Sequence, residues 1–308
     1  MNKRELTERS EGAKELLQPR VGGGKRFLGI VPGTGWKEGL EGLFRPDGSP
    51  IDYKDLDVPG AESSIEGHSK SMQIGDIDGR PVIVMGRVHP NETTDPDIVL
   101  AMRMIIESVR ENLDGLIVTN GVGTLHGPVN EHLGRLASFV HTAVLNTAAH
   151  LFNGRRSEHV GVGDIAVVDS FDTTTIGKDT PLLAGDFHDL HHKGYHRDSD
   201  RFLNLGRDAV AAVQGRTPLA KFAYMHGPQF EGPGEKKRAR FFGGDVIGMS
   251  ALEGLVATKN GIPFSHLVLA TNGAFAPHSH EGNLDVGAAK AETTRAILKI
   301  LARDWPRG

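Results

Sequence analysis

The chain has 308 residues, which is long enough for one large domain or two small ones with a substantial hydrophobic core. Hydrophobic residues make up 38% and charged residues 24%, a balance typical of an ordered globular protein. The 35 basic and 39 acidic side chains give a net charge of −4, which excludes a general electrostatic attraction to nucleic acid or to an anionic membrane. There is no cysteine, so disulfides, thiolate metal sites and a thiol nucleophile are excluded as well.

The N-terminal segment, residues 1–18, is charged and lacks the hydrophobic core of a signal peptide. Apolar runs elsewhere are broken by charge, Gly or His well before the roughly 18 residues that a membrane span needs. We therefore expect a cytoplasmic protein.

Strands and helices are predicted to alternate along the chain. Apolar runs bounded by Gly, Pro, Asn or Asp predict six strands, at Arg26–Val31, Pro81–Gly86, Leu116–Asn120, Asp164–Asp169, Phe222–His226 and Phe264–Thr271. Helical spacing and capping residues predict four helices, from Asp95 to about Val109, over Asn130–Phe152, from a capping box at Ser250–Glu253 to Asn260, and over about Leu284–Trp305. No Ser/Pro-rich linker divides the chain, so we expect one α/β domain over residues 1–308, with a sheet covered on both faces.

The loops that follow these strands are the first places to look for chemistry, because such sheets bind ligands at their strand ends. Gly33-Thr34-Gly35 combines close backbone approach with a hydroxyl, although a plain tight turn is the better explanation when this motif is taken alone. Arg87 and His89 are two residues apart and would converge on one anion if the strand geometry continued. A surface arginine beside an unrelated histidine is the alternative.

Three later segments together suit a nucleobase. Phe230 offers a ring for stacking beside the carboxylate of Glu231, and Asn272 supplies an amide at a strand end. Ser250 stands at the predicted start of a helix, where an anion is stabilised.

At these residues the sequence resembles the trimeric purine nucleoside phosphorylases, together with the methylthioadenosine phosphorylases. The resemblance spans roughly residues 26–302 and rests on six blocks in order, Gly33-Thr34-Gly35, Gly86-Arg87-Val88-His89, Thr119-Asn120-Gly121-Val122-Gly123, Gly227-Pro228-Gln229-Phe230-Glu231, Gly244-Asp245-Val246-Ile247-Gly248-Met249-Ser250 and Thr271-Asn272. It implies a single domain with a central mixed, partly barrel-like sheet flanked by helices, and a homotrimer.

The resemblance also implies a role for each matched position. The phosphate-binding residues would be Thr34, Arg87, His89, Gly121 and Ser250. The substrate-binding residues would be Phe230, Glu231, Met249, Asn272 and His280, with Met249 against the ribose and His280 near the 5′-hydroxyl. Among all of these, the catalytic residues would be Asn272, His89 and Glu231.

The implied reaction is phosphorolysis, a pentosyl transfer used in purine salvage. Phosphate attacks C1′ of a purine ribonucleoside and the base departs, giving free purine and ribose 1-phosphate. Positive charge develops on the sugar and negative charge on the base, so the protein must orient the phosphate and donate to the leaving purine. We expect no metal and no cofactor, with inorganic phosphate as co-substrate.

The choice of nucleoside is open. Glu231 with Asn272 is the family's 6-oxopurine pattern, favouring inosine or guanosine, whereas Gly33-Thr34-Gly35 and the segment 169–174 look more like the methylthioadenosine branch. An inserted helical segment, about residues 125–160, departs from the family pattern, as do Asn91 and Gly232, so a specialised nucleoside is also compatible.

Three other activities compete with this interpretation. A nucleosidase would use water in the same pocket, and a non-catalytic protein would only bind the nucleoside there. A metal-dependent hydrolase would use the histidines between His188 and His196, although no recognisable ligand motif is present.

Overall fold

The computed structural model describes residues 3–62, 69–88, 100–126, 159–172, 200–225, 230–250, 252–273 and 279–308. The strands are β1 (Phe27–Val31), β2 (Arg45–Pro46), β3 (Ile51–Asp52), β4 (Ser71–Ile77), β5 (Arg80–Met85), β6 (Leu113–Thr124), β7 (Ile165–Asp172), β8 (Leu219–Tyr224), β9 (Val246–Gly248) and β10 (Phe264–Asn272). The α-helices are α1 (Lys3–Val21), α2 (Lys37–Leu40), α3 (Ala101–Val109), α6 (Asp200–Gln214), α7 (Pro233–Phe241), α8 (Leu252–Asn260), α9 (His280–Ala289) and α10 (Ala291–Asp304).

The described strands form one mixed sheet of ten, and half of it closes on itself. Strands β10, β7, β8, β9 and β6 follow one another, and β6 pairs back to β10, which makes a five-stranded barrel. From β6 the sheet continues through β1, β5 and β4, with β2 and β3 both paired to β4. The expected mixed, partly barrel-like α/β fold is confirmed.

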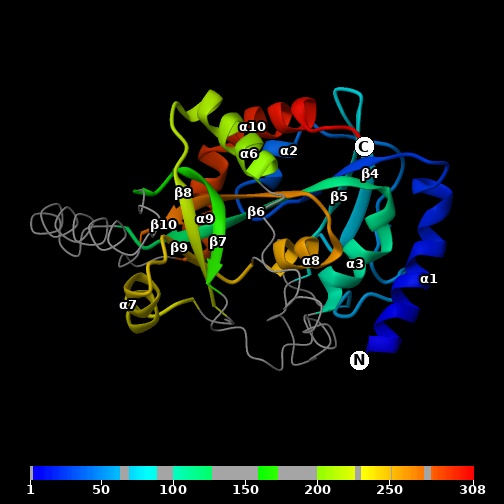
Figure 1. Cartoon of the computed structure of the whole chain (residues 1–308), viewed down its shortest axis with the longest axis horizontal. Coiled ribbons are helices and arrows are strands. Elements are labelled where there is room, and N and C mark those ends of the chain that lie inside the picture. The colour runs from blue at the N-terminus through cyan, green and yellow to red at the C-terminus, as the bar shows by residue number, and fades with distance from the viewer. Residues whose placement is uncertain are drawn as a thin grey trace, which may run out of the picture.

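Helices cover the sheet in two groups (Figure 1). Helices α2, α6 and α10 pack together on one side, and α1, α3 and α8 lie on the other. In α10, Ile297, Leu298 and Leu301 are fully buried, the spacing of an amphipathic helix that faces a core. All five residues of β1 are buried, so the prediction of strands covered on both faces is confirmed there.

All six predicted strands are present, with ends shifted by a few residues, but β2, β3, β4 and β9 were not predicted. Strands β2, β3 and β9 have only two or three residues, too few for a periodic pattern, and β4 contains the polar residues Gln73 and Asp76. Helices α1, α2 and α6 were not predicted either: α1 is dominated by charged residues, and α2 has only four residues.

The last predicted helix, Leu284–Trp305, is wrong as a single helix. The structure has two helices, α9 and α10, which meet at Lys290. They pack on different neighbours, α9 against β10 and α10 against α2 and α6. The start of the helix predicted from Asp95 and the whole helix predicted over Asn130–Phe152 lie outside the described residues.

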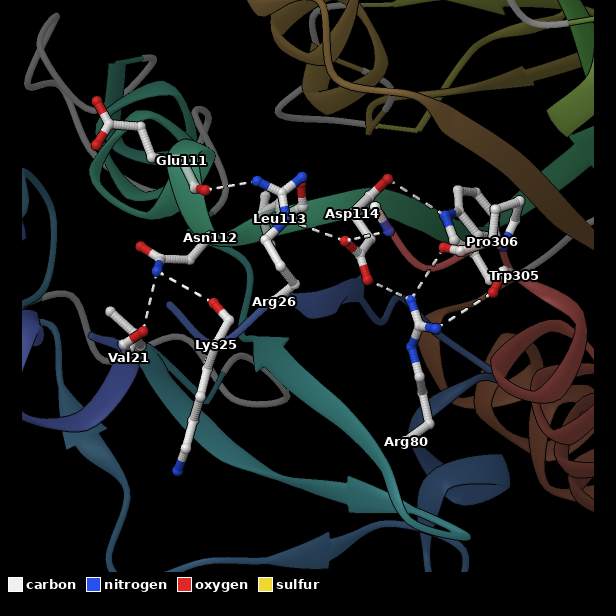
Figure 2. Close-up of polar contacts among 11 residues, drawn as sticks. Val21, Lys25, Arg26, Arg80, Glu111, Asn112, Leu113, Asp114, Trp305 and Pro306 are labelled. Carbon is white, nitrogen blue, oxygen red and sulfur yellow. Dashed lines mark hydrogen bonds and ion pairs between the residues drawn. The ribbon is translucent and has the colours of Figure 1, made fainter. Parts of the chain in front are cut away.

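A buried charge cluster fixes the N-terminal end of β6 (Figure 2). Asp114 accepts hydrogen bonds from Arg80 Nη2 at 2.6 Å and from Arg26 Nε at 3.0 Å. Arg80 also bonds to the carbonyl oxygens of Trp305 and Pro306, at 3.2 Å each. The N-terminal end of β6 is therefore bonded to the segment that follows α10, whereas the C-terminal end of β6 lies at the candidate site.

Candidate active site

Four strands deliver their carboxyl ends to one edge of the sheet. Strand β1 is parallel to β5 and to β6, and β6 is parallel to β10. Gly33 and Thr34 follow β1 and Arg87 follows β5, whereas Gly121 lies in the last four residues of β6 and Asn272 is the last residue of β10. Four of the predicted site residues are thus brought to the edge where such sheets bind ligands.

The loop after β1 is a tight turn held against β6. Gly33 N–H donates to Thr119 Oγ1 at 3.2 Å, and that hydroxyl donates to Val31 O at 3.1 Å. Gly35 has φ +81°, a conformation that favours glycine, and it lies against Gly287 of α9. Gly33 and Gly35 therefore allow both the tight turn and its close packing against β6 and α9.

Thr34 lies over the glycine-rich end of β6. Its Cβ would be 3.3 Å from a Cβ placed on Gly121, and Thr271 Cγ2 of β10 would be equally near. A side chain at Gly121 would crowd both threonines, so glycine allows β6 to pack closely against the Thr34 loop.

Arg87 follows β5 and is only 3% exposed. Its Nε donates to Glu253 Oε1 at 2.6 Å, and its Nη2 donates to Thr119 O at 3.2 Å. Its Nη1 would lie 2.9 Å from a Cβ on Gly33. The guanidinium is therefore placed beneath the Gly33-Thr34 turn, with one edge held by a carboxylate.

Lys37 adds a second cation near this turn. It is half-buried at the start of α2, and its pKa is lowered, chiefly by burial, with Glu38 opposing the shift and Arg87 contributing to it. Sequence reasoning missed Lys37 because one lysine in a short turn carries no pattern.

Asn272 ends β10 opposite Gly123 of β6. Its Nδ2 would be 3.0 Å from a Cβ on Gly123, and its Oδ1 accepts from Thr271 Oγ1 at 3.4 Å. Nδ2 is buried and, within the described residues, has no hydrogen-bond partner. A buried amide donor without a partner is costly, which is expected of a group that awaits a ligand.

Met249 and Ser250 reach the same edge from β9. This strand is antiparallel to β6, and a Cβ on Gly248 would lie 3.7 Å from Gly121 O. Both residues are partly exposed. The predicted capping box at Ser250 is wrong, because the Glu253 carboxylate accepts from Arg87 instead of reaching back to the start of α8.

Phe230 and Glu231 lie just before α7. That helix packs through Ala239 against Ile247 of β9 and Leu125, beyond the end of β6. The described contacts bring Thr34, Arg87, Gly121 and Asn272 close to one another's strands. The packing of α7 brings the segment of Phe230 and Glu231 toward this group. The structure thus brings their helix to the site without showing them in contact with Asn272.

Glu231 is a buried carboxylate, 8% exposed. Burial raises its pKa, and its own backbone N–H and the nearby Lys236 partly oppose the shift. Lys236 is itself buried, although the run of charged residues at 235–240 is a pattern typical of a solvated helix face.

Several sequence predictions fall outside what the structure describes. His89 lies in the range 89–99, nearly all of the inserted segment lies in 127–158, and the cluster from His188 to His196 lies in 173–199. His280 begins α9, and its side chain is not described. Among the described residues, no group of three or more His, Asp or Glu side chains is arranged to hold a metal ion. In the same part of the chain, no helix combines the length and the apolar character needed to cross a membrane.

A family model describing the phosphorylase superfamily matches residues 28–303, so the chain belongs to that superfamily. It is 25% identical over 305 residues to a purine nucleoside phosphorylase of Mycobacterium bovis, covering 96% of both chains. It is also 25% identical over 248 residues to a purine nucleoside phosphorylase of Saccharomyces cerevisiae, covering 79% of this chain and 71% of the relative. A crystal structure of the Schistosoma mansoni purine nucleoside phosphorylase with inosine has the same fold, with a TM-score of 0.69 at 22% identity and 98% coverage of both chains.

Proposed function

We propose that the protein is a purine nucleoside phosphorylase that uses inorganic phosphate to cleave a 6-oxopurine ribonucleoside, such as inosine or guanosine. The products are the free base and ribose 1-phosphate. The observation that carries this proposal is the juxtaposition of an oxyanion donor set and an unpaired amide donor at one sheet edge. Arg87 and Thr34 supply the first, and Asn272 Nδ2, which has no hydrogen-bond partner within the described residues, supplies the second.

The phosphate is assigned to the space between the Thr34 turn and the end of β6. Arg87 is assigned to it through Nη1, Thr34 and Ser250 through their hydroxyls, and Gly121 through its backbone, which lies close to Thr34. His89 is assigned to the same anion by the family resemblance. A bound phosphate held by these groups would be oriented for attack on C1′, which removes an entropic barrier.

The purine is assigned to the Asn272 side of the pocket. Asn272 Nδ2 donates to the N7/O6 edge as negative charge builds on the departing base, so its hydrogen bond strengthens in the transition state. Glu231 accepts from the opposite edge of a 6-oxopurine and Phe230 stacks on the ring. Met249 and His280 are assigned to the ribose and its 5′-hydroxyl.

This chemistry needs no metal, redox cofactor or covalent enzyme intermediate. The step balances: the phosphate oxygen forms the new bond to C1′, the N-glycosidic bond breaks with its electron pair going to the base, and the base takes up one proton while hydrogen phosphate gives up one on becoming the sugar phosphate. We further propose a cytoplasmic homotrimer that serves purine salvage, as the family resemblance implies. Equilibrium sedimentation giving the mass of three chains would support the trimer, and a monomer mass would count against it.

The proposed substrate class is tested by incubating the protein and phosphate with inosine, guanosine, adenosine and methylthioadenosine. We expect release of hypoxanthine and guanine at least about tenfold faster than release of adenine from either adenosine compound, a difference of about 1.4 kcal/mol in transition-state binding. Faster cleavage of methylthioadenosine would move the assignment to that branch of the family. Tight purine binding without any turnover would favour a binding protein.

A further inference from the structure

Glu253 is a buried carboxylate to which the proposed mechanism gives no role. It lies in the first turn of α8, and its side chain is 3% exposed. Its Oε1 accepts from Arg87 Nε at 2.6 Å, whereas its Oε2 has no hydrogen-bond partner among the described residues. The carboxylate does not cap its own helix. Among the described residues, its hydrogen-bond partner is Arg87, so its burial is linked to that contact.

Arg87 is held by two elements that are far apart in the sequence. Glu253 of α8 holds Nε, and the carbonyl oxygen of Thr119 in β6 holds Nη2. A guanidinium is planar, so fixing these two nitrogens fixes the direction of the third. That third nitrogen, Nη1, lies under Gly33.

These two hydrogen bonds set the orientation of the Arg87 side chain. The residue is buried on a segment just past the end of β5, where the strand ladder no longer constrains the backbone. Without the carboxylate, the guanidinium could rotate about its flexible stem and turn Nη1 away from the turn at Thr34.

We propose that Glu253 is a positioning residue that aims Arg87 at the phosphate. This inference rests on the proposed function, because it assigns phosphate to the Thr34 turn. The role is geometric: what Glu253 supplies is an acceptor oxygen at the right distance from Nε, and the negative charge on it is secondary.

Two conservative variants separate geometry from charge. Glu253→Gln keeps the side-chain length and an acceptor oxygen but removes the charge, so we expect its KM for phosphate to stay within about threefold of wild type. Glu253→Asp keeps the charge but is one methylene shorter, so its carboxylate no longer reaches Nε, and we expect its KM for phosphate to rise about tenfold. In both variants the KM for inosine, measured at saturating phosphate, should stay within about twofold.

A matched control is available in the other Arg–Glu pair of this region. Arg103 Nε donates to Glu107 Oε1 at 3.0 Å in α3, and Glu107 also lies near the far end of α8, 3.6 Å from Lys259 Nζ. Glu107→Asp makes the same chemical change without touching the site, and its KM for phosphate should not change.

The inference is overturned if Glu253→Asp leaves the KM for phosphate unchanged. It is also overturned if Glu253→Gln raises the KM for phosphate more than Glu253→Asp does. A rise in the KM for inosine together with the KM for phosphate would overturn it as well. Failure of the proposed function is distinguishable, since wild-type protein would then release no base with phosphate. In that case the affinity of the same variants for inorganic phosphate is measured by calorimetric titration. We expect Glu253→Gln to bind phosphate nearly as tightly as wild type and Glu253→Asp to bind it more weakly.

Discussion

His266 Nε2 lies 2.5 Å from Asn120 Oδ1, and this buried contact joins β10 to β6 shortly before both strands reach the candidate site. The imidazole stacks on Phe171 with ring centroids 5.4 Å apart. Its Nδ1 has no hydrogen-bond partner within the described residues. The ring is therefore neutral, and its Nε2–H donates to Asn120 Oδ1 between the two strands.

Burial, with a contribution from Arg87, lowers the pKa of His266 to about 3 from an ordinary value of 6.5. The unfolded chain takes up this proton near pH 6.5 and the folded chain does not, so stability is lost as the pH falls through that window. Between pH 7 and pH 5 the loss from this residue is on the order of 2 kcal/mol. Urea unfolding at both pH values should show a smaller loss for His266→Gln than for wild type. Equal pH dependence in the two proteins would refute the assignment.

Asp114 is expected to be a major contributor to stability. Its side chain is 2% exposed and binds Arg80, whose side chain is 4% exposed (Figure 2). Asp114→Ala leaves a buried guanidinium without its counter-charge, so the free energy of unfolding should fall by about 3–5 kcal/mol. The exposed pair of Arg303 with Asp304 is the control: Asp304→Ala should cost less than about 1 kcal/mol in the same denaturant titration. Similar losses in the two variants would mean that burial of the Asp114 ion pair does not increase its contribution to the free energy of unfolding.

Gly33 has no room for a side chain. A Cβ there would lie 2.5 Å from the backbone of both Thr119 and Asn120, and 2.9 Å from Arg87 Nη1. Gly33→Ala should therefore cost about 1–3 kcal/mol of stability through overpacking, and it should raise the KM for phosphate. A Cβ on Gly12 in α1 would have nothing within 4 Å, so Gly12→Ala should stabilise by roughly 0.5–1 kcal/mol without affecting that KM. A Gly33→Ala protein with wild-type phosphate kinetics would contradict the placement of the anion.

In the proposed reaction the ionised Glu231 carboxylate accepts from the ring N–H of a 6-oxopurine. Burial raises its pKa above the ordinary 4.5, so the acceptor is lost on acidification at a higher pH than an exposed glutamate would require. The kcat/KM for inosine should fall as the pH drops through that raised pKa, since this ratio reports groups of the free enzyme. Glu231→Gln should lower kcat/KM at pH 7 and remove the acidic limb of the profile. Persistence of the same limb in the variant would assign it to another group.

The sequence was sufficient for the parts of the fold with strong local signals. The apolar runs of β1 and β10 predicted buried strands, and the family blocks predicted one site for Thr34, Gly121 and Asn272, whose strands and loops lie together in the structure. The Arg87–Glu253 pair was beyond such reasoning, because its partners are 166 positions apart and Glu253 also satisfied a local capping pattern. The break at Lys290 was hidden for a similar reason: both α9 and α10 have helical sequences, and only tertiary packing separates them.

In the proposed reaction phosphate, rather than water, attacks C1′ of the ribose. The decisive measurement is the release of hypoxanthine from inosine with and without inorganic phosphate, together with identification of the sugar product. We predict negligible release without phosphate and, with it, one ribose 1-phosphate for each hypoxanthine. Phosphate-independent release accompanied by free ribose would contradict the account and make the protein a nucleosidase.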